Sequence, residues 1–158
     1  MAFTYTDVIS ELKTLISNNW TKSNTDNIKP NFEYIYSKKR LDSFWNGDWI
    51  LLQRISVSES NTCIGNIGRD RKYRLYVDIR SDYIDSTATD DGVAGITHIT
   101  KMEKEFLRLI DTNATYQFTT GTGTIELDEG LTDMSDGLKN AFRSRGVLKI
   151  TKYNEAVS

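Results

Sequence analysis

Arg69–Ser81, with the sequence Arg-Asp-Arg-Lys-Tyr-Arg-Leu-Tyr-Val-Asp-Ile-Arg-Ser, is the stretch that decides the predicted fold. From Tyr73 it alternates between apolar and polar residues. One side of an extended chain takes Tyr73, Leu75, Val77 and Ile79, and the other takes Arg74, Tyr76, Asp78 and Arg80. Because successive side chains of a strand point to opposite faces, this period of two predicts a half-buried strand. We expect its apolar side to pack under helices and its polar side to lie at the surface.

Two amphipathic helices are predicted, one before and one after this strand. Thr4–Trp20 carries an apolar stripe at helical spacing, with Thr4 and Asp7 as a capping box and Trp20 closing the end of the core. Ile96–Asp111 carries a second stripe, with its charged residues largely outside. Both patterns are typical of helices that pack on a sheet.

Further strands are predicted from short apolar or alternating runs bounded by turn residues. They are Asn31–Ser37, Asp48–Val57, Thr124–Thr132 and Ala141–Tyr153. The order α-β-β-β-α-β-β predicts an α+β fold, with a mixed or antiparallel sheet of about five strands and two helices on one face. The connections at 58–68, 82–95 and 112–123 are long, which is typical of functional loops.

The composition is that of one globular domain over residues 1–158, with 38% hydrophobic and 27% charged residues. No apolar run approaches the roughly 20 residues that a membrane helix needs, so no membrane association is expected. The first residues lack the basic and apolar regions of a signal peptide. A single cysteine, Cys63, excludes an internal disulfide and fits a reducing compartment.

Charge is distributed unevenly along the chain, although the net charge is only −2. Residues 33–80 hold 9 Lys or Arg against 6 Asp or Glu, and residues 137–158 hold 5 against 1. Residues 82–136 hold 3 against 12, a net charge of −9. This acidic block is a poor surface for duplex DNA. It is either a solvated face or a surface that lets a polyanion pass or docks on a basic partner.

The sequence offers no recognisable catalytic or cofactor motif. His98 is the one histidine, and neither it nor Cys63 has partners at catalytic or metal-ligand spacing. Asp90-Asp91 and Asp128-Glu129 are possible Mg²⁺ ligands, but neither pair is followed by the lysine of a nuclease core. We therefore expect no enzyme, no metal site and no cofactor.

The basic residues of the central strand allow two interpretations. Arg69, Arg71, Arg74 and Arg80, interleaved with tyrosines, offer charge and stacking surfaces for nucleic acid. The alternative is a sheet face whose Arg and Tyr side chains pack and pair with acidic neighbours.

Four segments resemble the tail terminator (tail completion) proteins of tailed viruses, especially those of archaea. The first is the helix end with Asn18-Asn19-Trp20-Thr21-Lys22-Ser23-Asn24-Thr25, and the second is Pro30 before a strand. The third is Arg40-Leu41-Asp42 leading to Asn46-Gly47-Asp48-Trp49-Ile50-Leu51-Leu52. The fourth is Arg69–Ser81, followed by a helix and two strands. The likeness covers most of the chain and lies in the pattern and order of elements.

The resemblance implies a structural virion protein, assembled in the host cytoplasm, without chemistry of its own. Such subunits form a ring, usually a hexamer, on the head-proximal end of the tail tube, where they stop tube polymerisation and join the neck. DNA passes through the lumen of the ring without specific binding, and the acidic block could line that lumen. In this interpretation the interaction surfaces include Cys63, Asn66, Arg69, Arg71, Arg74, Arg80, Asp90, Asp91, Asp128 and Glu129.

Other functions stay open at this point. A head-completion or stopper protein of the neck is also small and ring-forming, and a tail tube subunit has a related fold. Outside virions, the main alternative is an α+β module that binds nucleic acid through residues 69–80.

Overall fold

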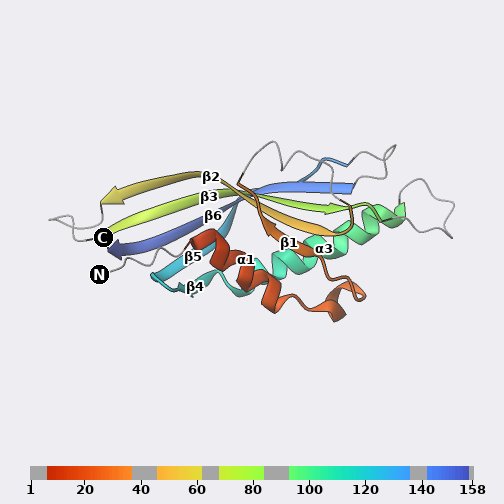
Figure 1. Ribbon diagram of the computed structural model, residues 1–158, viewed down its shortest axis with the longest axis horizontal. Coiled ribbons are helices and arrows are strands. Elements are labelled where there is room, and N and C mark those ends of the chain that lie inside the picture. The colour runs from red at the N-terminus through yellow and green to blue at the C-terminus, as the bar shows by residue number, and fades with distance from the viewer. Residues whose placement is uncertain (1–6, 37–45, 62–67, 84–92, 136–141, 157–158) are drawn as a thin grey trace.

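The computed structural model describes residues 7–36, 46–61, 68–83, 93–135 and 142–156. Its elements, in chain order, are α1 (Val8–Asn19), η1 (Lys22–Thr25), β1 (Asn31–Tyr34), β2 (Trp49–Asn61), β3 (Gly68–Ser81), α3 (Val93–Thr112), β4 (Thr115–Phe118), β5 (Gly121–Asp133) and β6 (Phe142–Ala156). The α+β class with both helices on one face of a mixed sheet is thereby confirmed (Figure 1).

The sheet has the strand order β1-β2-β3-β6-β5-β4. Only β1 and β2 are parallel, and every other neighbouring pair is antiparallel. The two outermost strands, β1 and β4, are short, whereas β2, β3, β5 and β6 span 13 to 15 residues each. The long strand predicted at Arg69–Ser81 is β3, and it lies in the interior of the sheet.

The sixth strand, β4, corrects the predicted element order. The connection expected at 112–123 contains β4 and the start of β5, which form a hairpin through Thr119-Thr120. Gly121, directly after this two-residue turn, has a φ of 138°, a backbone region that favours glycine. Similarly, β2 continues to Asn61 and β3 begins at Gly68, so the predicted 58–68 loop is shorter than expected.

The first helix begins later than predicted. Asp7 is its N-cap, and a carboxylate oxygen of Asp7 accepts a hydrogen bond of 2.9 Å from the backbone N–H of Ile9. The predicted capping box is therefore wrong, because Asp7 takes the cap position itself. Thr4 lies outside the described residues. The second helix begins at Val93 rather than Ile96.

The main core lies between the sheet and the helices. The predicted stripes of both helices are buried, and so are Tyr73, Leu75, Val77 and Ile79 on the facing side of β3, as predicted. Trp20 closes one end of this core, as predicted, and its indole N–H donates a 2.9 Å hydrogen bond to the carbonyl of Ile28.

Glu105 contradicts the prediction that the charged residues of the second helix lie outside. It is buried on α3, where its carboxylate accepts hydrogen bonds from the backbone N–H of Thr21 (3.0 Å) and the side-chain amide of Asn24 (2.9 Å). Arg108, one turn along the helix, pairs with the same carboxylate at 2.5 Å. Burial raises the pKa of Glu105, but these hydrogen bonds outweigh it and lower the pKa below its ordinary value. Glu105 thereby ties the η1 segment to α3.

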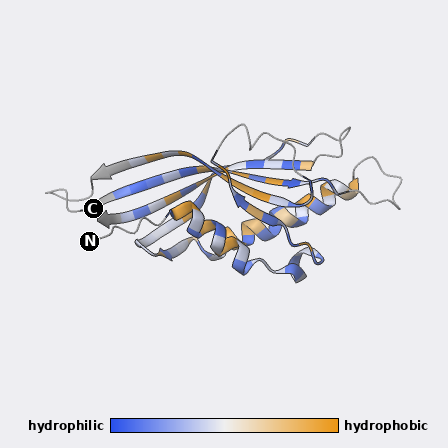
Figure 2. Ribbon diagram, viewed as in Figure 1, coloured by the Kyte–Doolittle hydropathy of each residue, from blue (hydrophilic) through white to orange (hydrophobic). Residues whose placement is uncertain are grey.

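Part of the sheet extends beyond the helices. Figure 1 shows β2, β3 and β6 continuing past α1 on the left, and Figure 2 shows mainly hydrophilic residues on β3 there and a mixture of hydrophilic and hydrophobic residues on β2. We call Arg54–Asn61 of β2 and Gly68–Lys72 of β3 the arm. Arg54, Ile55, Ser56, Val57 and Ser58 are all exposed there. The β2 side of the arm is therefore open to solvent at five consecutive described side chains.

Candidate functional site

The face of the sheet opposite α1 and α3, here called the polar face, carries four of the ten predicted site residues, namely Arg74, Arg80, Asp128 and Glu129. This face follows from the alternation of β3. The residues between the buried Leu75, Val77 and Ile79 point away from the helices, to the opposite face of the sheet. Strands β3, β5 and β6 contribute charged residues to it. These are Arg74, Asp78, Arg80, Glu126, Asp128, Glu129, Arg143, Arg145 and Lys149.

Asp78 is the centre of a buried ionic cluster on this face. Its carboxylate accepts hydrogen bonds from the Nε of Arg80 (2.7 Å), from Nε and Nη2 of Arg143 (both 2.8 Å) and from Nε of Arg145 (2.8 Å). Asp78 itself is fully buried. Burial raises its pKa, but the hydrogen bonds and charges of Arg143 and Arg80 outweigh burial and hold the pKa below its ordinary value. The carboxyl is therefore ionised at neutral pH.

This cluster corrects the prediction for the polar side of β3. Asp78 and Arg80 were expected at the surface, but both are buried. Tyr76, between the cluster and the arm, packs against Ile35, Leu51 and Trp49 in a second, small apolar cluster on the same face. The guanidinium carbon of Arg145 lies 5.1 Å from the centre of the Tyr76 ring. This end of the polar face is therefore packed rather than open.

Closer to the arm, the charges of the polar face form exposed pairs. The Nε of Arg74 lies 2.8 Å from a carboxylate oxygen of Asp128, and its Nη2 lies 3.8 Å from Glu129. On the next strand pair, the Nζ of Lys149 lies 3.1 Å from Glu126. Three acidic residues of the −9 block thus lie beside two basic residues, one on β3 and one on β6. The structure brings together three predicted site residues here, Arg74, Asp128 and Glu129.

The remaining predicted site residues are placed as follows. Cys63, Asn66, Asp90 and Asp91 lie outside the described residues, and Arg69 is placed only as a backbone position in β3. Arg71 is half-buried, opposite Lys152 in the register of β3 and β6. Arg71 and Arg74 therefore point to opposite sides of the sheet and do not form one surface.

A second polar cluster, which the sequence analysis did not predict, joins the start of β2 to α3. The Nε2 of His98 lies 2.9 Å from Oδ1 of Asp48, and the hydroxyl of Ser81 donates to the same oxygen at 2.6 Å. The His98 ring stacks on Tyr83 at 4.2 Å between centroids. Burial raises the pKa of Asp48, but the hydrogen bonds from His98 and Ser81 outweigh it and lower the pKa.

These three residue types match a hydrolase triad, but their geometry differs. In a triad the histidine bonds both the serine and the carboxylate, so that it can take the serine proton. Here Ser81 and His98 both bond Asp48, and the Ser81 oxygen also accepts the backbone N–H of Tyr83 at 3.1 Å. The cluster ties the end of β3 to β2 and α3, which is a structural role.

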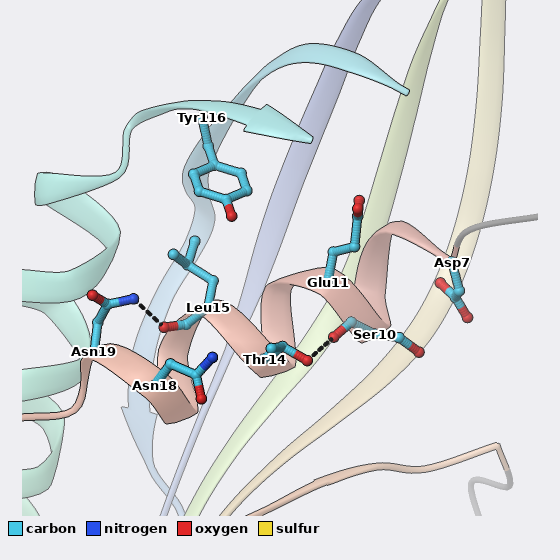
Figure 3. A pocket seen from close by; sticks show the side chains of 8 residues that line it. All are labelled: Asp7, Ser10, Glu11, Thr14, Leu15, Asn18, Asn19 and Tyr116. Carbon is cyan, nitrogen blue, oxygen red and sulfur yellow. Dashed lines mark hydrogen bonds between the residues drawn. The ribbon is translucent and has the colours of Figure 1, made fainter. Parts of the chain in front are cut away.

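Two shallow hollows lie on the helix side of the molecule. One of about 400 Å³ is lined by His98 and Tyr83 together with Asp26, Ile28 and Lys101. The other, of about 360 Å³, follows α1 and is shown in Figure 3, where Tyr116 of β4 points toward the helix. Its lining is mostly polar, with Asp7, Ser10, Glu11, Thr14, Asn18 and Asn19 around Leu15. Among the described residues, no group of three or more His, Cys, Asp or Glu side chains could hold a metal ion.

No helix in the described part of the chain is both long and apolar enough to span a membrane. Comparison with models of known protein families finds no match, and neither does comparison with curated protein sequences.

Proposed function

We propose that this chain is a structural subunit of a tailed virus, a tail terminator that forms a homo-oligomeric ring on the head-proximal end of the tail tube. The ring stops tube polymerisation and joins the tail to the neck, and it works by shape and contact rather than by chemistry. Its partners in this proposal are further copies of the chain, the tube protein and the neck protein. Its place is in the virion, after assembly in the host cytoplasm.

The proposal rests on the resemblance of the sequence and on one structural observation. The observation is that every charged residue named on the polar face lies beside one of opposite sign, with five basic residues against four acidic ones. Arg80, Arg143 and Arg145 share Asp78, Arg74 lies beside Asp128 and Glu129, and Lys149 lies beside Glu126. A basic residue whose charge is matched by a carboxylate contributes little to phosphate binding. Such a face suits a surface that DNA passes without binding, and it favours the ring protein over a nucleic-acid-binding module.

The same ion pairs change the net charge expected for the proposed acidic lumen. Asp128 and Glu129 lie beside Arg74, so this part of the acidic block is closer to neutral than its sequence predicts. In the proposed ring, the polar face near Arg74 is a lumen surface of balanced charge. Replacing Asp128 and Glu129 with lysine would create a cluster of three positive charges there, which should retain DNA and slow its ejection.

The decisive experiment is co-production of the chain with the tail tube protein encoded by the same virus. Electron microscopy should show tubes ending in an extra ring, and tubes that are shorter than those formed without the chain. Tubes of unchanged length and unchanged ends would contradict the proposal. A DNA-binding titration over a range of salt concentrations separates the rival module, because tight, salt-dependent binding of the unmodified chain would favour that module instead.

A further inference from the structure

The two long outer edges of the sheet differ in how they are protected. The short strand β1 pairs with β2 only at Trp49–Leu52, and β4 pairs with β5 only at Gly121–Thr124. We call the outer edge of β2 over Gln53–Asn61 the β2 edge, and the outer edge of β5 over Glu126–Asp133 the β5 edge. Within the described ranges, no strand pairs with either edge. An open edge of this length offers unpaired backbone groups to another chain.

The β5 edge carries the features that prevent edge pairing. Its register with β6 shifts twice, between Leu127 and Glu129 and between Glu129 and Thr132. It also holds four acidic residues and no basic one, so two such edges would repel each other.

The β2 edge lacks most of these features. It has no Pro and no Lys, and its register with β3 shifts once, at Ile55. Ile55 and Val57 are 37% and 40% exposed, although they are apolar. We infer that the β2 edge pairs with the β2 edge of a second copy of this chain, in an antiparallel arrangement around a two-fold axis, so that the two sheets become one.

The sequence of the β2 edge is complementary to itself in one register. In this register the two-fold axis passes at Val57, an exposed apolar residue near the middle of Gln53–Asn61. Val57 then lies opposite Val57 of the second copy, and Ser56 lies opposite Ser58. Residues directly opposite each other in an antiparallel pair lie on the same face of the sheet. Val57, Ser56 and Ser58 of the second copy therefore lie on the same face as the residues they oppose in the first copy.

The shift at Ile55 brings the charged positions together. In the pairing with β3, Arg54 faces Leu75 and Ser56 faces Arg74, so Ile55 is the extra residue of a bulge. If Ile55 stays in a bulge in both copies, position 54 of one copy lies opposite position 59 of the other. The two-fold axis produces the same pair a second time, with the two copies exchanged. Those positions hold Arg54 and Glu59. Two reciprocal pairs of opposite charge therefore flank the central valines.

The extent of the pairing also fits the rest of the sheet. The second copy's strand would pair with β2 from Gln53 to about Ser60, whereas β1 pairs with β2 over Trp49–Leu52. The second strand therefore fills the length of β2 that β1 leaves open. This inference is separate from the proposed function, because a two-fold contact closes at two copies whereas a ring needs head-to-tail contacts through other surfaces.

Charge reversal of the exposed Arg54 tests the pairing. Arg54→Glu and Glu59→Arg should each weaken dimerisation by about tenfold or more, since each places like charges opposite each other twice. A mixture of the two variants should restore the dimer as a heterodimer, because every pair then again has opposite charges. Sedimentation or light scattering measures the mass, with 18.1 kDa for one copy. Circular dichroism melting curves check that each variant is folded.

Disulfide trapping gives a second, independent test. In a Cys63→Ser background, Val57→Cys should form a disulfide-linked dimer on mild oxidation, because cross-strand Cα atoms lie at roughly 4.5–5.5 Å, within disulfide range. Ile96→Cys in the same background is the control, since Ile96 is also apolar and 49% exposed but lies on α3. A monomer at all concentrations, a mixture that fails to restore the dimer, or equal trapping of both cysteines would overturn the inference. Each of these outcomes leaves the tube-capping experiment unaffected.

Discussion

The two halves of β3 belong to one continuous strand but have different surroundings. In Gly68–Arg74, Lys72 is exposed and Arg74 is half-buried, with its charge matched by carboxylates that are themselves partly in solvent. In Leu75–Ser81, both sides of the strand are covered, and Asp78 and Arg80 are as buried as most of the core. The comparison shows that a period of two identifies the faces of a strand but not how deeply each face is covered. The same residue type, arginine, is part of a buried cluster at one end and of a surface pair at the other.

The largest difference between the two halves is expected when an acidic partner is removed. Asp78→Ala takes the shared carboxylate away from three guanidinium groups in a buried site, and should lower the free energy of unfolding by about 3–5 kcal/mol. Asp128→Ala removes the partner of Arg74 at the surface and should cost less than about 1 kcal/mol. Urea unfolding followed by circular dichroism measures both. Equal losses would mean that the two sites do not differ in burial as the structure describes.

Truncation of an apolar residue should separate the covered sheet from the arm. Ile79→Ala opens a cavity in the main core and is expected to cost about 2–5 kcal/mol. Val57→Ala removes a side chain that is 40% exposed, and should change stability by no more than about 0.5 kcal/mol when the chain is measured as a monomer. The same urea titration at low protein concentration provides the comparison. A large loss for Val57→Ala would show that the arm is covered in the free chain.

A smaller difference is expected in acid, because the protonated carboxyl of Asp78 can still form some hydrogen bonds. The pKa of Asp78 is lowered in the folded chain, from an ordinary value of 3.8. Its stabilising contribution is therefore complete above about pH 4 and is lost as the pH falls through the lower folded pKa. The stability gap between the unmodified chain and Asp78→Asn should shrink over this acidic range. A gap that stays constant down to about pH 2 would contradict the lowered pKa.

The smallest effect should come from Arg74 itself. Arg74→Ala removes an exposed ion pair and is expected to cost less than about 1 kcal/mol in low salt. The loss should nearly vanish in about 1 M salt, where charges at the surface are screened over a few ångströms. Unfolding at two salt concentrations measures this, with Asp78→Ala as the matched control, whose effect should persist in salt. An effect of Arg74→Ala that does not depend on salt would indicate packing rather than charge.

Local patterns in the sequence predict most of the fold. The apolar stripes of both helices and the apolar side of β3 predict the correct elements and the correct core. This works because an element buried on one face has apolar residues at regular spacing in its sequence. β4 was not predicted as a strand, because four residues, Thr115–Phe118, are too few to show a period above a turn-rich background. The ends of the elements in the structure also differ from the predicted ends. Asp7, for example, lies at the N-cap rather than inside the first helix, and one hydrogen bond to its side chain decides this position.

The polar clusters could not be predicted, because their members are far apart in the sequence. Arg143 and Asp78 are 65 residues apart, and His98 and Asp48 are 50 apart, so their contacts depend on the strand order. Glu105 shows the same limit within a helix. It lies beside the apolar stripe of α3, and only the position of η1 decides that it is buried. Alternation and spacing describe one element at a time, whereas these clusters belong to pairs of elements.

The position of β6 in the sheet has a consequence for the order of folding. β6 lies between β3 and β5, although it follows both in the sequence. Until residues 142–156 have been synthesised, β1, β2 and β3 form one piece, β4 and β5 form another, and no strand joins them. A ribosome-bound chain therefore exposes the inner edge of β3, the strand with the regular alternation from Tyr73, for much of its synthesis. Insertion of β6 between two waiting strands is expected to be the slow step of folding, because it depends on contacts of long sequence separation.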